Sequence, residues 1–180
     1  MMKKTLNRNT FRIRHSQWER AEHEVNQLVD QLSKPIDPAI RTAVVAFRAE
    51  GFVTTASCAG HPKWGGLFPW VDVDACSSGR PASALDHSDP TRRGTETSVR
   101  LNLKSQLRML GILSAFYADR KVPIEQRLII VPRGIFGAFQ VVPQGGTVQK
   151  VLSRIKQKAR LASFRREFQD LAAYLHSRVG

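Results

Sequence analysis

Residues 51–66, GFVTTASCAGHPKWGG, hold the side chains of this sequence that are best suited to chemistry. Cys58 stands between a serine and a short glycine turn, and His61 follows three residues later. A thiolate becomes a nucleophile where a nearby cation or helix N-terminus lowers its pKa, and a histidine can accept its proton. Cys58 and His61 are therefore candidate catalytic residues. Because single cysteines are more often small buried side chains than nucleophiles, a binding turn is the favoured interpretation.

The same segment offers hydroxyl and backbone N–H groups at the end of a predicted strand. Thr55, Ser57 and Gly60 supply these groups, which suit a phosphate or the edge of a nucleotide. Lys63 and Trp64 add a cation and a ring on which a base can stack. The sequence therefore predicts a ligand-binding turn with nucleic-acid contacts at Lys63 and Trp64.

Cysteine and histidine spacing raises the alternative of a zinc site. Cys58, His61, Cys76 and His87 are spaced C-x₂-H-x₁₄-C-x₁₀-H, and zinc takes four tetrahedral nitrogen or sulfur ligands. A two-residue gap suits one zinc knuckle, but the ten-residue gap before His87 does not. The sequence therefore predicts no bound metal, with zinc as a minority alternative.

An acidic pair on a predicted strand is a further candidate for metal chemistry. Asp72 and Asp74 alternate with Val71 and Val73 in FPWVDVDA, so both carboxylates are expected on one strand face. Two carboxylates could hold Mg²⁺ for phosphoryl chemistry. Alternating acids are also common on the wet face of a strand, and no third acid has a place beside them.

The segment GFVTTASCAGH resembles the Thr-Ser-Ser-Cys-Ser-Gly-Arg segment of the wybutosine-synthesising tRNA methyltransferases, and similar turns are familiar from uncharacterised phage and plasmid-borne proteins. Thr55, Ser57, Cys58 and Gly60 match that segment. A serine of the family is replaced by alanine, and its arginine is replaced by His61. The resemblance covers about a dozen residues. It implies an α+β fold, a tRNA substrate and S-adenosylmethionine as cofactor.

Charge is concentrated at both ends of the sequence. The 180 residues carry a formal net charge of +13. Residues 1–20 hold six Lys or Arg against one acid, and residues 147–180 hold eight against two. Two basic ends around a nearly neutral middle favour a polyanion partner, most often nucleic acid. The predicted contacts at the C-terminal end are Lys150, Arg154, Lys158 and Arg165, which recur on one side of a predicted helix.

Composition bounds the class of protein. The sequence is 42% hydrophobic and 24% charged, as in an ordinary globular domain. Two cysteines make no disulfide framework, so a reducing cytoplasm is the expected compartment. No apolar run is long enough for a membrane span, and no apolar segment of a secretory signal follows the basic N-terminal residues.

Apolar periodicity predicts the elements that position these residues. Helices are expected over 16–32, with a capping box at Ser16 and Glu19, and from Asp37 to Gly51, with Asp37 as N-cap and Gly51 at the C-terminal end. Strands are expected at 52–55, 68–75, 96–103, 127–133 and 137–143. A largely buried helix is expected over 105–120, and a long helix follows Thr147. Residues 76–95 are expected to form a mobile loop.

These elements predict an α+β fold with a mixed or mainly antiparallel sheet of about five strands, two N-terminal helices, a crossover helix and a long C-terminal helix. The predicted divisions are a basic arm at 1–15, a core at 16–146 and a basic helix at 147–180. The favoured function is a nucleic-acid- or nucleoprotein-binding accessory protein rather than an enzyme. Two alternatives stay open: an RNA-modifying, methyltransferase-like enzyme using the Cys58 turn, and a phage- or plasmid-type interaction or inhibitor protein that docks on an acidic protein partner.

Overall fold

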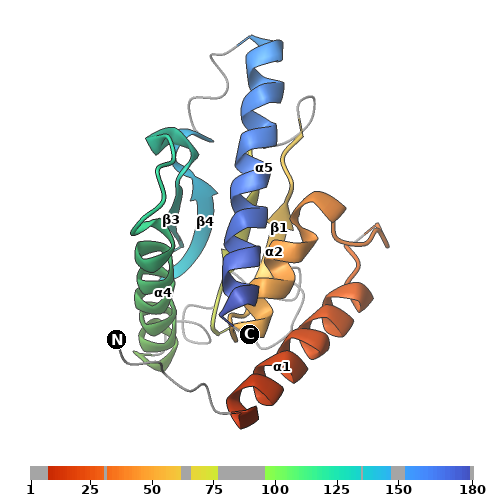
Figure 1. Ribbon diagram of the computed structural model, residues 1–180, viewed down its shortest axis with the longest axis vertical. Coiled ribbons are helices and arrows are strands. Elements are labelled where there is room, and N and C mark those ends of the chain that lie inside the picture. Colours follow the sequence, from red (N-terminus) through yellow and green to blue (C-terminus); the bar gives the residue numbers. More distant parts are fainter. Residues whose placement is uncertain are drawn as a thin grey trace.

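The structure is a computed structural model that describes residues 8–30, 32–61, 66–76, 96–134, 136–146 and 153–178. Within these ranges it is an α+β fold of four α-helices and one four-stranded antiparallel sheet, with a long C-terminal helix, as the sequence predicts. Figure 1 shows α2 and α5 lying in front of the sheet, with α4 beside them and α1 on the outer side of α2. No helix in the described ranges is both long and apolar enough to cross a bilayer.

The first two helices differ in how well local signals place their ends. Helix α1 (Arg8–Gln27) begins eight residues before the predicted start at Ser16, so the residues of the predicted capping box lie inside the helix. Helix α2 (Pro38–Ala49) begins as predicted, because the Asp37 carboxylate accepts the Ala39 N–H at 2.9 Å. Gly51 ends it with a φ of +79°, a conformation that favours glycine.

The sheet is formed by β1 (Thr54–Cys58), β2 (Trp70–Val73), β3 (Leu128–Arg133) and β4 (Ala138–Pro143) in the order β1-β2-β4-β3. Every neighbouring pair is antiparallel. Val71 lies opposite Val141, and Val141 lies opposite Ile130. Because side chains alternate between the two faces of a strand, this row points to one face. Val71 and Val141 are fully buried in the core with residues of the helices.

The predicted strand at 96–103 is wrong, and this correction reduces the predicted five strands to four. These residues form the first two turns of α4 (Glu96–Tyr117), which also replaces the predicted helix start at Ser105. The alternation of Leu101 and Leu103 with polar residues suggested a strand, but both leucines are exposed. The buried side chain is Asn102, at 1% exposure. Its amide donates to the Asp74 carboxylate and the Phe136 carbonyl, and its Oδ1 accepts the Ala75 N–H.

Helix α5 (Arg154–Ser177) contributes two phenylalanines and several aliphatic side chains to the buried residues. Phe164, Phe168 and Leu171 are completely buried. Ile155, by contrast, is 83% exposed and lies outside the core. Thr147, the predicted N-cap, lies outside the described residues, and the described helix follows Ser153. The fold therefore uses α5 as a core helix only from Leu161 onwards.

Candidate nucleic-acid interface and the Cys58 turn

The turn after β1 requires glycine at position 60. Gly60 has a φ of +75°, and a Cβ placed there would lie 2.7 Å from Leu161 Cδ1 and 2.7 Å from the Phe68 carbonyl carbon. A larger residue would strain the backbone and collide with α5 at the same time. Position 60 therefore has both a conformational and a steric reason to be glycine.

The polar groups of the turn are used within the molecule. The Gly60 N–H donates to Cys58 Sγ at 3.3 Å. Arg165 of α5 donates through Nε to the Ala59 carbonyl at 2.8 Å and through Nη2 to the Gly60 carbonyl at 2.6 Å. Arg165 thus fastens the turn to α5 by two charge-assisted bonds. Sequence reasoning assigned Arg165 to nucleic acid and missed this role, because the bonded residues are 105 and 106 positions apart.

The hydroxyl residues of the predicted binding turn lie in β1 rather than in the turn. Ser57 pairs with Val71, and Thr55 sits where the register shifts between Thr54 and Ala56. Both side chains are half-buried. Ser57 and its neighbour Cys58 point to opposite faces of the strand, as successive residues do. The structure therefore places Thr55 and Ser57 within β1, before the turn at Gly60.

The two cysteines lie at opposite ends of the β1–β2 pair. Cys58 is opposite Trp70 at the start of β2, whereas Cys76 follows the far end of β2. The Cys76 thiol donates to the Ser98 carbonyl at 3.2 Å, and burial raises its pKa above that of an ordinary thiol. His61 lies 3.9 Å from the Asp37 carboxylate and is half exposed. His87 lies outside the described residues, and within them no three Cys, His, Asp or Glu side chains gather as a metal site.

The acidic pair of β2 is also separated. Asp72 lies on the sheet, where Gln140 donates to its Oδ1 at 2.7 Å and Arg133 Nε lies 3.7 Å away. Burial raises the pKa of Asp72, although the Gln140 hydrogen bond and the Arg133 charge oppose the rise. Asp74 lies beyond the strand and accepts the Asn102 amide and the Cys76 N–H. The two carboxylates therefore face different partners and share no site.

The first turns of α5 form an exposed basic segment, which we call the basic end of α5 (residues 154–160). None of its side chains is buried, and it carries Arg154, Lys156, Lys158 and Arg160 with no acid. None of the four makes an ion pair with another described residue. Figure 1 shows this end of α5 extending past the sheet. Of the predicted contacts, Arg154 and Lys158 lie here, while Lys63, Trp64 and Lys150 lie outside the described residues.

Sequence reasoning missed Lys156 and Arg160 because it assumed a helix with one packed side. Residues two apart on a helix lie on nearly opposite sides, so Lys156 points away from Arg154 and Lys158. On a packed helix that side would be covered, but the basic end of α5 has no covering element among the described residues. The positive charge therefore surrounds the helix instead of forming one face.

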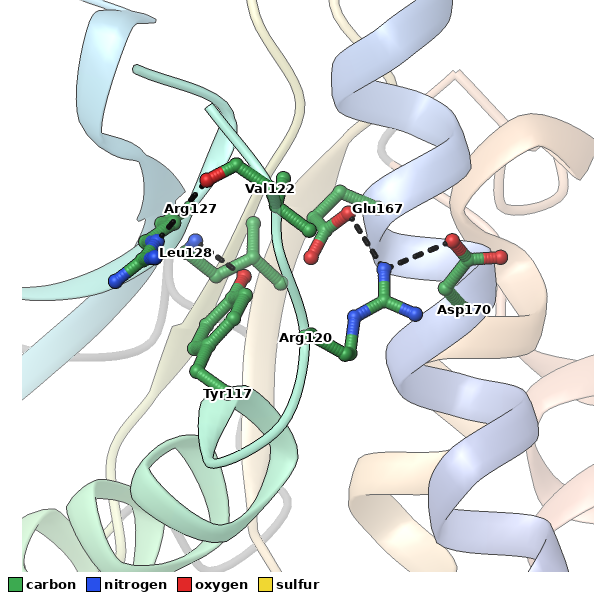
Figure 2. Close-up of polar contacts among 7 residues, drawn as sticks. All are labelled: Tyr117, Arg120, Val122, Arg127, Leu128, Glu167 and Asp170. Atoms are coloured by element: carbon green, nitrogen blue, oxygen red, sulfur yellow. Dashed lines mark hydrogen bonds and ion pairs between the residues drawn. The ribbon is translucent and has the colours of Figure 1, made fainter. Parts of the chain in front are cut away.

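The opposite half of α5 carries acids, and these hold an arginine from the segment after α4. Figure 2 shows Arg120 Nη2 between Glu167 Oε2 and Asp170 Oδ2, each at 3.0 Å. Glu167 is 95% buried, and its Oε1 has no hydrogen-bond partner in the structure. Tyr117 accepts the Leu128 N–H at 2.7 Å beside this group. The cluster ties α5 to α4 and β3, and it is a structural contact rather than a reactive site.

A hollow of about 520 Å³ lies beside this cluster, between the C-terminal ends of α4 and α5. Phe116, Arg120, Asp170 and Tyr174 are among the residues that line it. The Arg120 guanidinium stacks over the Phe116 ring at 4.3 Å. The charged groups that reach the hollow from Arg120 and Asp170 already bind one another, so they leave little unpaired charge for a ligand.

The chain matches no protein-family model, and comparisons with curated proteins and with solved structures find no match. The resemblance of residues 51–61 to wybutosine-synthesising tRNA methyltransferases therefore stays a prediction. A nucleoside cofactor needs a concave site with free backbone groups. At the described turn, the Gly60 N–H and the carbonyls of Ala59 and Gly60 are already bonded. These residues do not fit S-adenosylmethionine.

Proposed function

We propose that this protein binds nucleic acid through the basic end of α5. The observation that carries the proposal is the combination of four cations, no acid and no buried side chain in residues 154–160. Phosphate contacts of this kind give binding that depends on salt and little on base sequence. The protein then acts as a nucleic-acid- or nucleoprotein-binding accessory protein.

Helix electrostatics support a phosphate ligand. The N-terminus of a helix carries a partial positive charge, so cations in the first turns oppose the helix dipole and cost about 0.3–1 kcal/mol each where they are exposed. Arg154 and Lys156 lie in the first turn of α5, which contains no acidic residue. Their presence there is not explained by helix stability. An anionic backbone beside this end would be attracted by the dipole and by the side chains together.

A salt titration of binding tests the proposal. The variant combines Arg154→Gln, Lys156→Gln and Lys158→Gln, whose side chains are exposed and outside the core. Binding of labelled single-stranded and duplex DNA and RNA is measured by fluorescence anisotropy at several salt concentrations. Each lost phosphate contact removes about 0.7–0.9 from the slope of log affinity against log salt. We expect the slope to fall by roughly 2 to 3.

A matched control removes the same charge elsewhere. Arg20→Gln, Lys34→Gln and Lys121→Gln also replace three exposed cations, and they should leave the slope nearly unchanged if the basic end of α5 makes the contacts. If the slope falls equally in the two variants, binding depends on the net charge of the protein and not on the position of the cations. If the wild type shows no binding at low salt, the basic end of α5 instead suits an acidic protein surface, the alternative function.

A further inference from the structure

One side of α4 exposes a row of leucines that the fold does not use. Leu103, Leu107 and Leu110 are spaced by four and three residues, so they lie on one face of the helix. Their exposed fractions are 49%, 71% and 51%. We call this row the leucine face of α4. Single exposed leucines are ordinary, but three in contiguous helical positions form a patch of the kind found at interfaces.

Other sides of α4 make contacts within the chain. Its inner face buries Asn102, Met109 and Phe116. On one flank, Gln106 donates to the Gly137 carbonyl at 2.7 Å. On the other flank, Arg108 stacks over the Phe52 ring at 4.4 Å. The leucine face is therefore the side of α4 that neither the core nor the two flanking contacts cover.

The leucine face of one copy is complementary in shape to the leucine face of a second copy that runs in the opposite direction. Leu103 and Leu107 are large and lie toward its N-terminal end, whereas Gly111 and Ser114 are small and lie toward its C-terminal end. A Cβ added at Gly111 would meet nothing within 4 Å. In an antiparallel pair related by a two-fold axis, the large residues of one helix lie over the small residues of the other. A parallel pair would set large against large and leave a gap between the small residues.

Charge favours the same antiparallel arrangement. Arg100 and Lys104 are exposed beside the leucine face in its N-terminal half, and neither makes an ion pair with a described residue. The last turn of α4 has no basic residue, and the C-terminal end of a helix carries a partial negative charge. An antiparallel pair places the cations of one copy near the negative end of the other. A parallel pair would place the cations of both copies side by side.

We propose that the leucine face of α4 binds the same face of a second copy of this chain, in antiparallel orientation about a two-fold axis near Leu110, so that Leu107 of each copy lies over Gly111 of the other. One helix face provides less area than a standard protein interface, so the dimer is weak, with a Kd on the order of 10–100 µM. This proposal does not depend on the nucleic-acid function.

Sedimentation equilibrium of the whole chain over about 1 µM to 1 mM measures this dimer. The wild type should pass from monomer to dimer across the range. Leu107→Glu replaces, in each copy, the leucine that lies over Gly111 of the other copy with a carboxylate that the interface would bury, and it should raise the Kd at least about 100-fold. Because position 107 is exposed and glutamate is a good helix former, circular dichroism and thermal unfolding should be unchanged.

Leu101→Glu is the matched control, because Leu101 is 43% exposed and, six residues from Leu107, lies on a different side of α4. It should leave the Kd within a few-fold of the wild type.

Gly111→Phe tests the orientation, since it fills the space that receives Leu107 of the second copy and should raise the Kd at least about tenfold. A wild type that stays monomeric to the highest concentration overturns the proposal, as does equal weakening by Leu101→Glu and Leu107→Glu. An unaffected Gly111→Phe dimer overturns the antiparallel pairing.

Discussion

Residues 161–175 of α5 bury seven side chains in the fold, whereas residues 154–160 of the same helix bury none. The buried half contains Phe164 and Phe168, which are both fully buried, and its two acids hold Arg120. The exposed half carries only cations as its charged residues. One continuous helix therefore separates the residues that stabilise the fold from those available to a partner. Substitutions in the two halves should change different measurements.

The largest expected effect lies in the buried half. Phe168→Ala should lower the free energy of unfolding by about 3–5 kcal/mol, because Phe168 is fully buried and its loss leaves a cavity. Ile155→Ala, in the exposed half, should change it by less than about 0.5 kcal/mol. Urea unfolding at pH 7 measures both. Similar losses for the two variants would show that the first turns of α5 also pack on the protein.

An intermediate effect is expected at Arg165, a half-buried residue within the buried half of α5. Arg165→Gln removes two charge-assisted bonds to the carbonyls of Ala59 and Gly60, so it should lower the free energy of unfolding by about 1–3 kcal/mol. Arg166→Gln is the matched control, since its neighbouring side chain is exposed, and should cost less than about 0.5 kcal/mol. If Arg165→Gln keeps full stability but lowers the salt slope of nucleic-acid binding, Arg165 contacts phosphate, as the sequence suggested.

The smallest effect at neutral pH concerns Tyr117, which lies beside the Glu167 cluster. Tyr117→Phe removes the acceptor of the Leu128 N–H and should cost about 1 kcal/mol at pH 7. Burial raises the pKa of Tyr117 above the ordinary value of about 10. Above about pH 10 the unfolded chain therefore releases this proton first, and stability falls by up to about 1.4 kcal/mol per pH unit.

Comparing urea unfolding of the wild type and Tyr117→Phe between about pH 7 and pH 11 isolates this contribution. The wild type should lose more stability on the alkaline side, so the difference between the two proteins shrinks as the pH rises. A constant difference across this range would mean that the Tyr117 hydroxyl titrates alike in the folded and unfolded chain.

The sequence predicted α2, β3 and β4 well, because residues close to their ends determine where these elements begin and end. Asp37 and Gly51 mark the ends of α2 through a side-chain cap and a positive φ. The pair at 127–133 and 137–143 is confirmed as β3 and β4, each within one residue of its predicted bounds.

A local signal also failed, since the predicted capping box at Ser16 and Glu19 lies inside α1. Two other errors come from contacts between distant parts of the chain. The alternation in 96–103 indicates a strand only if the leucines face inward, but Asn102 is the residue that faces inward, where it binds groups from 74–75 and 136. Likewise, the helical spacing of Lys and Arg does not show which of them contact the rest of the fold. Arg165 binds the Cys58 turn, whereas Lys158 is exposed. Neither fact has a signal within a few residues of its position.

The bond from Arg165 to Ala59 also has a consequence for synthesis of the chain. Translation places residue 59 outside the ribosome long before residue 165, which is 106 positions later. During that interval the Cys58 turn lacks its hydrogen bonds from Arg165. The core around Phe47 of α2 also lacks the side chains that α5 contributes to it. Chains whose core is completed by a segment made much later expose apolar surface while they are nascent. The contacts of residues 38–60 with α5 can therefore form only after residues 154–177 have emerged.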